Sequence, residues 1–157
     1  MSIIFSKRAS VFEVEEGKKL QPKFDEKGLI PVITIDTQDK QVLMHGYMNE
    51  EALKLSMKTK LAHYWSRSRK MMWKKGETSG FYQEIKKIKI DDDQDCIILF
   101  VELTGVKASC HVGYKSCFYR ELKNDGGNFT TSLVFTENKK IFDPEKVYKG
   151  MENPTKL

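Results

Sequence analysis

The stretch that decides the fold class is Cys96-Ile97-Ile98-Leu99-Phe100-Val101-Glu102-Leu103, a nearly continuous apolar run. A short run of this kind, rich in β-branched and aromatic residues, indicates a well-buried β-strand. Residues 81–90 predict a second clear strand, and the acidic run 91–95 between the two predicts the connection. We therefore expect a mainly β fold built on these two strands.

The rest of the chain predicts more strands and little helix. Residues 29–35 and 41–47 are typical of two strands joined as a hairpin. Asn49, with Glu50 and Glu51 after it, predicts a helix N-terminus, where a capping side chain and negative charge are favoured. The expected fold class is mainly β (α+β), with a barrel-like mixed sheet and one or two short helices. Further strands are expected at 62–65 and 131–136, loops at 66–70 and 73–80, and a turn at 125–128.

Composition bounds the class of protein. The 157 residues fit one domain, and 39% hydrophobic with 11% aromatic content excludes a disordered chain. No apolar run approaches the roughly 20 residues of a membrane helix, and the N-terminus lacks the apolar stretch of a signal peptide. Three Cys are an odd number, which argues against a disulfide framework and for a reducing, cytoplasmic compartment. The net charge of +5 allows an anionic partner without identifying one.

Changes in composition and patterning along the sequence divide the chain into three parts. Residues 1–28 are charged and weakly patterned, and they predict an N-terminal extension with one short helix at most. Residues 29–123 hold the main domain. Residues 124–157 are expected to form a C-terminal strand and tail packed on the same domain.

The first candidate site is acidic. Asp91, Asp93 and Asp95 alternate, so an extended backbone would place them on one face about 6.6 Å apart. A divalent cation would relieve their mutual repulsion, but a solvated acidic turn fits the spacing equally well. The spacing from Asp91 to Glu102 matches that of an EF-hand calcium loop. We exclude an EF-hand because Cys96 stands where that loop needs glycine.

The second candidate site contains sulfur. Cys110 and His111 are neighbours and Cys117 lies seven residues after Cys110. Thiolates and imidazole are the usual zinc donors. Two Cys this far apart are weak evidence for a metal, and the spacing alone favours buried, inert thiols. A lone His also fits an ordinary polar side chain.

The third candidate site is basic and rich in small residues. Arg67 and Arg69 precede Trp73, and Thr78 and Ser79 follow it in a glycine-containing loop. Guanidinium groups, hydroxyls and flexible backbone are what a phosphate site uses, and an indole can stack on a base. A nucleic-acid surface or an ordinary solvated loop would show the same residues.

In combination, these motifs resemble phosphoribosyl-AMP cyclohydrolase, a family of histidine biosynthesis. The resemblance covers about residues 29–122, with a further likeness at 142–148. Its motifs are Gly46-Tyr47-Met48-Asn49-Glu50-Glu51-Ala52-Leu53, Tyr64-Trp65-Ser66-Arg67-Ser68-Arg69, Trp73 with Lys75-Gly76-Glu77-Thr78-Ser79-Gly80, Asp91-Asp92-Asp93-Gln94-Asp95, and Ser109-Cys110-His111-Val112-Gly113-Tyr114-Lys115-Ser116-Cys117-Phe118-Tyr119-Arg120.

The resemblance implies an activity and an assembly. Family members open the purine ring of phosphoribosyl-AMP at N1–C6, the third step of histidine biosynthesis, with a water activated by zinc. They are intertwined homodimers that form their active sites at the subunit interface and bind Zn²⁺ and Mg²⁺. Only about 35 residues follow Leu122, so we expect the single-function form without a fused second enzyme.

The resemblance also implies residue roles. Cys110 and Cys117 match two zinc ligands, and His111 matches a residue that moves protons. The magnesium ligands it implies are Asp91, Asp93 and Asp95, and the substrate-binding residues are Arg67, Arg69, Trp73, Thr78 and Ser79.

Three positions depart from the family pattern. Asp92 stands where the family has its third zinc-binding Cys, and it could bind as an oxygen ligand in a harder site. Cys96 lies four residues further on, about 13 Å away in extended backbone, which makes it a poor substitute. Lys74 and Phe81 stand where the family tends to have His.

Three hypotheses follow. The first is an active phosphoribosyl-AMP cyclohydrolase. The second is a divergent relative that binds a phosphorylated purine with altered or no metal-dependent catalysis. The third, a nucleic-acid-binding module, rests only on the basic loops and the modest net charge.

Overall fold

The computed structural model describes residues 2–157, which form eight strands and three short helices. The larger share of strand confirms the mainly β prediction, although the number of helices exceeds the one or two expected. The elements in chain order are α1 (Val11–Glu16), β1 (Ile30–Asp36), β2 (Val42–Met48), α2 (Glu50–Thr59), β3 (His63–Ser66), β4 (Met71–Lys74), β5 (Gln83–Ile90), β6 (Ile97–Leu103), β7 (Arg120–Asp125), β8 (Asn128–Phe135) and α3 (Pro144–Val147).

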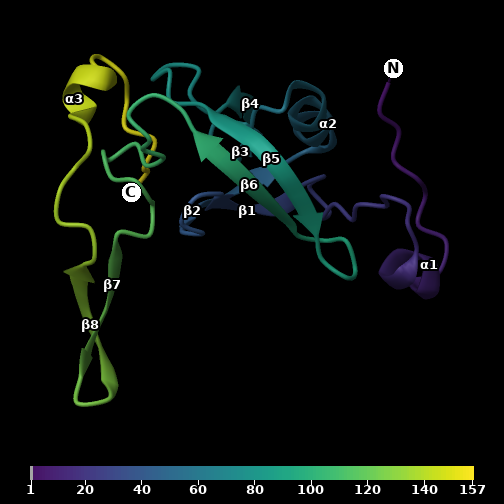
Figure 1. The fold of residues 1–157 in the computed structure, drawn as a ribbon, viewed down its shortest axis with the longest axis horizontal. Helices are drawn as coiled ribbons and strands as arrows, with labels where there is room; N and C mark the ends of the chain where they lie inside the picture. Colours follow the sequence, from purple (N-terminus) through teal and green to yellow (C-terminus); the bar gives the residue numbers. More distant parts are fainter. Residues whose placement is uncertain (1) are drawn as a thin grey trace.

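A four-stranded sheet in the order β2-β1-β6-β5 forms the body of the protein (Figure 1). The strands β1 and β2 pair antiparallel, as do β5 and β6, whereas β1 and β6 pair parallel with Val32 opposite Ile97. The two strands that decide the fold class are therefore neighbours. One parallel pair in an otherwise antiparallel sheet confirms a mixed sheet.

The sheet is open, so the barrel-like expectation is wrong. A barrel would need the edge strands β2 and β5 to be linked by pairing strands, but β3 and β4 pair with each other as a separate hairpin. The chain at the start of β3 reaches the β5 edge through one isolated bridge between Leu61 and Glu84. That contact is too short to continue the sheet.

The core lies on one face of the sheet. In β6, Ile97, Leu99, Val101 and Leu103 are buried while the residues between them are only partly buried. The side chains of α2 and β3 pack on this face in one continuous core. The apolar run of β6 is therefore completely buried on one face and partly exposed on the other, because alternate side chains of a strand point to opposite faces.

The helix α2 begins as predicted at Asn49, whose Oδ1 accepts a hydrogen bond from the Ala52 N–H at 2.8 Å. Ala52 and Leu53 are buried against the sheet. Ser56 is also buried, and its Oγ accepts the His63 N–H at 2.9 Å. This bond ties the helix to β3.

Tyr64 lies at the centre of a buried polar network that the apolar pattern does not reveal. Its hydroxyl is 2.6 Å from the Thr34 Oγ1 and donates to the Gln83 Oε1 at 2.7 Å. The Gln83 Nε2 in turn donates to the Ser109 Oγ at 2.8 Å. The ring lies so close to Gly46 that an added Cβ there would stand 2.9 Å from the ring. The network joins the sheet to the loop that follows β6.

The N-terminal extension is fastened to the connection between β5 and β6. Gln94 in that connection is 5% exposed, although its side chain is polar. Its Oε1 accepts the Gln21 N–H at 2.7 Å, and its Nε2 donates to the Val14 carbonyl oxygen at 2.9 Å. Val14 belongs to α1, which is the short helix expected in this part of the chain.

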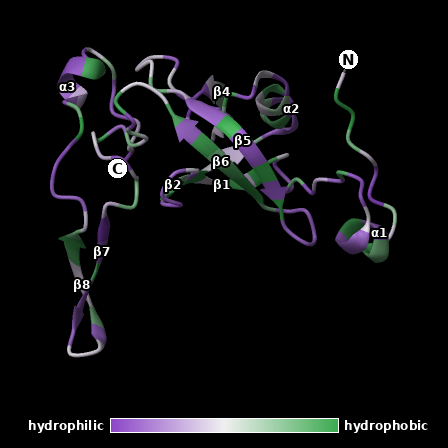
Figure 2. Cartoon of the chain, viewed as in Figure 1, coloured by the Kyte–Doolittle hydropathy of each residue, from purple (hydrophilic) through white to green (hydrophobic). Residues whose placement is uncertain are grey.

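The C-terminal part begins with a hairpin that extends away from the sheet (Figure 1). Its strands, β7 and β8, pair only with each other, and the expected turn at 125–128 joins them. Its strand β7 is mostly polar and β8 carries more apolar residues (Figure 2), and Leu122, Phe129, Leu133 and Phe135 are exposed. No helix of the described residues is long and apolar enough to cross a membrane.

Candidate functional site

The structure separates the candidate metal ligands into two groups at opposite ends of β6. The acidic loop, residues 91–96, connects β5 to the beginning of β6. The thiol loop, residues 109–117, follows the end of β6. Seven residues of strand span about 20 Å, so one chain keeps the two groups apart.

The acidic loop brings three carboxylates together. Asp91, Asp93 and Asp95 each place one oxygen so that all three lie within 4.8 Å of one another, which makes a possible metal-binding group. The backbone is a turn, which was one of the two alternatives, and not an extended chain, since Gln94 has a φ of 59°. Desolvation, with repulsion from Asp93 and Asp91, raises the pKa of Asp95. Asp92 is exposed and is not among these oxygens.

Hydrogen bonds from the backbone shape this loop. The Asp91 Oδ1 accepts the N–H groups of Asp95 and Cys96, each at 2.9 Å. Lys23 of the N-terminal extension forms a long ion pair of 3.9 Å with Asp95. Desolvation and the nearby carboxylates raise the pKa of the Cys96 thiol, which makes it a poor metal ligand.

The thiol loop brings Cys110 and Cys117 side by side. Its turn is closed by bonds from the Cys110 N–H to the Tyr114 carbonyl at 3.1 Å and from the Cys117 N–H to the Leu43 carbonyl of β2 at 2.7 Å. A hydrogen bond between the two thiol groups lowers the pKa of Cys110 to about 7 and raises that of Cys117. The pair can therefore carry a thiolate near neutral pH.

His111 lies next to this pair and is half-buried. Its Nε2 is buried and has no hydrogen-bond partner among residues 2–157. Desolvation and the charge of Lys75 lower the pKa of His111, while a hydrogen bond with Asn153 opposes the shift. The ring is therefore neutral at pH 7, with a nitrogen free for a ligand.

The expected substrate residues divide between the two ends of the β3–β4 hairpin. Arg67 and Arg69 lie in its turn, where the Arg67 guanidinium stands 4.2 Å from the centre of the Tyr47 ring. Ser79 follows β4 and lies beside Tyr148, whose pKa is raised by desolvation and by Cys110 and lowered by the Ser79 bond. Ser79, with its exposed neighbour Thr78, therefore belongs to the thiol end.

Trp73 is partly buried, and its expected stacking on a base stays a prediction. Its ring lies 5.2 Å from that of Tyr64 and packs against the core. Lys74 and Phe81, where the family tends to have His, contact other aromatic rings. The Lys74 Nζ is 5.4 Å from the centre of the Tyr82 ring, and the Phe81 ring is 5.2 Å from that of Phe142.

The C-terminal segment covers the thiol loop and contributes residues that the sequence analysis missed. The Ile141 N–H bonds to the Gly113 carbonyl at 2.7 Å, and the Phe142 ring lies 6.1 Å from that of Tyr148. Glu137 accepts the backbone N–H groups of Lys115 and Ser116 at 2.9 and 3.2 Å. No local pattern marks Glu137, because its partners lie more than 20 residues away.

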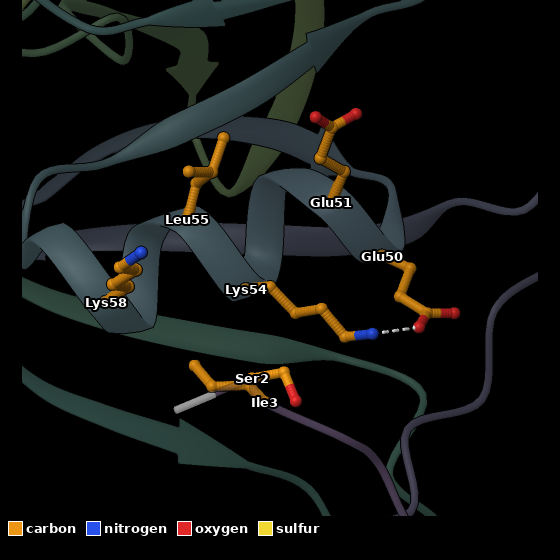
Figure 3. A pocket seen from close by; sticks show the side chains of 7 residues that line it. All are labelled: Ser2, Ile3, Glu50, Glu51, Lys54, Leu55 and Lys58. Atoms are coloured by element: carbon orange, nitrogen blue, oxygen red, sulfur yellow. Dashed lines mark hydrogen bonds and ion pairs between the residues drawn. The ribbon is translucent and has the colours of Figure 1, made fainter.

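A surface pocket elsewhere contains none of the candidate residues. It lies between the N-terminal segment and α2 (Figure 3), where Lys54 pairs with Glu50. Its remaining lining residues are Ser2, Ile3, Glu51, Leu55 and Lys58.

Comparison with known proteins gives the family. The model of the phosphoribosyl-AMP cyclohydrolase family matches residues 44–119. A protein of that name from Methanoregula boonei is 54% identical over 126 residues, which are 80% of this chain and 93% of its own. The chain belongs to the phosphoribosyl-AMP cyclohydrolase family.

Two further phosphoribosyl-AMP cyclohydrolases give the same result. The protein from Brucella canis is 46% identical over 134 residues, 85% of this chain and 96% of its own. That from Sinorhizobium medicae is 46% identical over 136 residues, 87% of this chain and 89% of its own. The part matched by the family model contains both the acidic loop and the thiol loop.

Proposed function

We propose that this protein is a phosphoribosyl-AMP cyclohydrolase, which hydrolyses the N1–C6 bond of the purine ring of its substrate in histidine biosynthesis. Relatives of that name match it over nearly their whole length. The observation that carries the proposal within the structure is the thiol pair, with the unpartnered Nε2 of His111 beside it. A biosynthetic enzyme of this kind would work in the cytoplasm.

The donors of the two loops suit two different metals. Cys110 and Cys117 are soft thiol ligands that already lie within hydrogen-bonding reach of each other, which fits zinc. The clustered oxygens of Asp91, Asp93 and Asp95 are hard ligands and fit magnesium. Zinc at the thiol pair would act as a Lewis acid that makes water a nucleophile near neutral pH.

A second copy of the chain would complete the zinc site. Two thiols fill only part of a tetrahedral zinc shell, and Asp92 of the same chain lies at the far end of β6. In a homodimer, the acidic loop of one chain could meet the thiol loop of the other, with Asp92 as an oxygen ligand. The exposed apolar side chains of the β7–β8 hairpin supply surface for such an assembly.

The remaining residues would bind substrate and move protons. His111 is neutral at pH 7 because its pKa is lowered, so its Nε2 can accept a proton from the attacking water. Thr78 and Ser79 lie at the thiol end and would bind a phosphate there. Arg67 and Arg69 lie elsewhere in the chain and would reach the second phosphate from their own loop or across the dimer.

The direct test is turnover. Purified protein supplied with zinc and magnesium is incubated with phosphoribosyl-AMP, and the absorbance change of ring opening is followed. Absence of turnover under these conditions would overturn the proposal.

The alternative is a divergent relative that binds a phosphorylated purine with altered or no metal-dependent catalysis, favoured by Asp92 in place of Cys. It predicts a protein without stoichiometric zinc, whereas a nucleic-acid-binding module would instead bind oligonucleotides at low salt.

Replacing Asp93 by Asn is expected to shift the magnesium dependence of turnover to higher concentration by about tenfold or more, because one charged oxygen of the acidic group is lost. Zinc content should remain nearly normal, since the thiol pair lies at the other end of β6. Turnover titrated with Mg²⁺ and elemental analysis measure the two effects. Equal loss of zinc and magnesium would contradict the assignment of two separate metals.

A further inference from the structure

Lys75 is a half-buried cation with no carboxylate partner. It follows β4 and takes part in none of the ion pairs found among residues 2–157. Its ammonium instead donates to the Ser109 carbonyl oxygen and lies 5.5 Å from the centre of the Trp73 ring. A lysine that is withdrawn from water normally needs a negative partner. Lys75 should therefore have an anionic partner other than a carboxylate.

The groups near Lys75 that can carry a negative charge are the thiols of Cys110 and Cys117. Ser109 directly precedes Cys110, so the ammonium is anchored at the entrance of the thiol loop. Burial lowers the pKa of Lys75, and the charges of Cys117 and Cys110 act in the opposite direction. Glu137, whose charge also acts on the two thiols, is engaged with the backbone of the same loop. The thiol pair is therefore the negative partner available to Lys75.

Ser109 is held from two sides, which makes this anchor rigid. Its carbonyl oxygen accepts from Lys75, and its Oγ accepts from Gln83, the end of the buried network that begins at Thr34. Its N–H closes the loop on the Lys115 carbonyl at 2.9 Å. The residue is only 2% exposed, so the backbone next to Cys110 has little freedom.

We propose that Lys75 is a positioning residue for the Cys110–Cys117 pair: its ammonium fixes the Ser109 carbonyl beside Cys110 and supplies the positive charge that both thiolates face. This inference rests on the metal-binding role proposed above for the two thiols. Cysteine binds metal as the thiolate, so a cation fixed nearby favours binding. Substituting a residue that holds a metal ligand in place commonly lowers metal affinity by about 10–100-fold.

The test compares Lys75→Met, Lys75→Gln and Lys75→Arg in the full chain. Zinc affinity is measured by competition with a chromophoric chelator, and the melting temperature of the metal-free protein is recorded for each variant. Lys75→Met and Lys75→Gln are expected to weaken zinc binding by about 10-fold or more, and Lys75→Arg to restore most of it. Lys75→Gln keeps a hydrogen-bond donor without the charge, so it serves if Lys75→Met does not fold.

Lys87→Met is the matched control. The Lys87 Nζ also stands over an aromatic ring, 5.7 Å from the centre of Phe100, but on β5 and away from the thiols. The Lys87→Met variant should bind zinc with the same affinity as the unaltered protein. Unchanged affinity in Lys75→Gln would overturn the proposal, and so would equal losses in Lys75→Gln and Lys75→Arg, since packing and not charge would then matter.

A second measurement needs neither zinc nor turnover. Alkylation of the thiol pair by iodoacetamide at fixed pH is followed by mass spectrometry of the peptides, and Lys75→Gln should slow it several-fold while Lys87→Met should not. An unchanged rate would contradict the inference. A protein that fails to turn over phosphoribosyl-AMP but shows these thiol effects would refute the proposed function and leave the role of Lys75 standing.

Discussion

Replacing Cys110 with alanine is expected to remove bound zinc and to lower turnover of phosphoribosyl-AMP by about a thousandfold or more, because a catalytic metal contributes several kcal/mol to the transition state. The remaining thiol, Cys117, would be a single soft ligand on an exposed part of the loop. Elemental analysis and turnover of the same sample measure both effects. Cys117→Ala should give the same result.

Cys96→Ala is the matched control for this substitution. Cys96 is a half-buried thiol at the acidic end of β6, where its raised pKa makes it a poor ligand. The variant should retain zinc and activity. Retention of zinc in Cys110→Ala would show that the thiol pair is not the metal site.

Mixing two inactive variants is expected to restore activity, which is the sharpest consequence of a site shared between two chains. Cys110→Ala lacks a thiol and Asp92→Ala lacks the proposed oxygen ligand, so each alone should be inactive. In a random mixture of refolded chains, half of the dimers pair unlike chains and keep one of two sites intact. Activity of about a quarter of the normal value is therefore expected.

The control for this experiment is the double variant that carries both substitutions in one chain. Mixed with the unaltered protein, it also forms dimers of unlike chains, but each of their sites lacks one ligand. Such mixtures should show no activity beyond that of the unaltered dimers that remain. Activity of Asp92→Ala on its own would exclude Asp92 as a required ligand.

Local signals in the sequence predicted a large part of the fold. The helix cap at Asn49 and the turn at 125–128 depend on neighbouring residues and were found where expected. The strands β1, β2, β5 and β6 lie within two residues of their predicted bounds, because apolar residues in the sequence mark the face of each strand that is buried. The separation of β3 and β4 from the main sheet depends on long-range packing, so the predicted barrel was wrong.

Elements without an apolar pattern escaped prediction. The strand β7 is fully exposed and mostly polar, so its sequence, Arg120-Glu121-Leu122-Lys123-Asn124-Asp125, carries no signal of a strand. It exists because it pairs with β8 across a turn. The short helix α3 is similar, since none of its four residues is buried.

The candidate site was predictable as a set of residues but not as a geometry. A sequence cannot show that Cys110 and Cys117 meet, because their turn depends on Gly113, which has a φ of 107° and lies against the Phe142 carbonyl. Nor can it show that the ring of Trp73, which we expect to stack on a base, also packs on Tyr64. Lys75 stood in the predicted basic loop without being distinguished from its neighbours, because only the fold places it beside Ser109.

The parallel pairing of β1 with β6 constrains the order in which the chain can fold during synthesis. The strand β1 ends at Asp36 and its parallel partner begins at Ile97, so about 60 residues must be made before the two can pair. At the usual rate of translation this takes about 3–12 s. Throughout that interval β1 can pair only with β2, and the edge of β1 that later pairs with β6 stays open. The nascent chain should therefore depend on chaperones until β6 has left the ribosome.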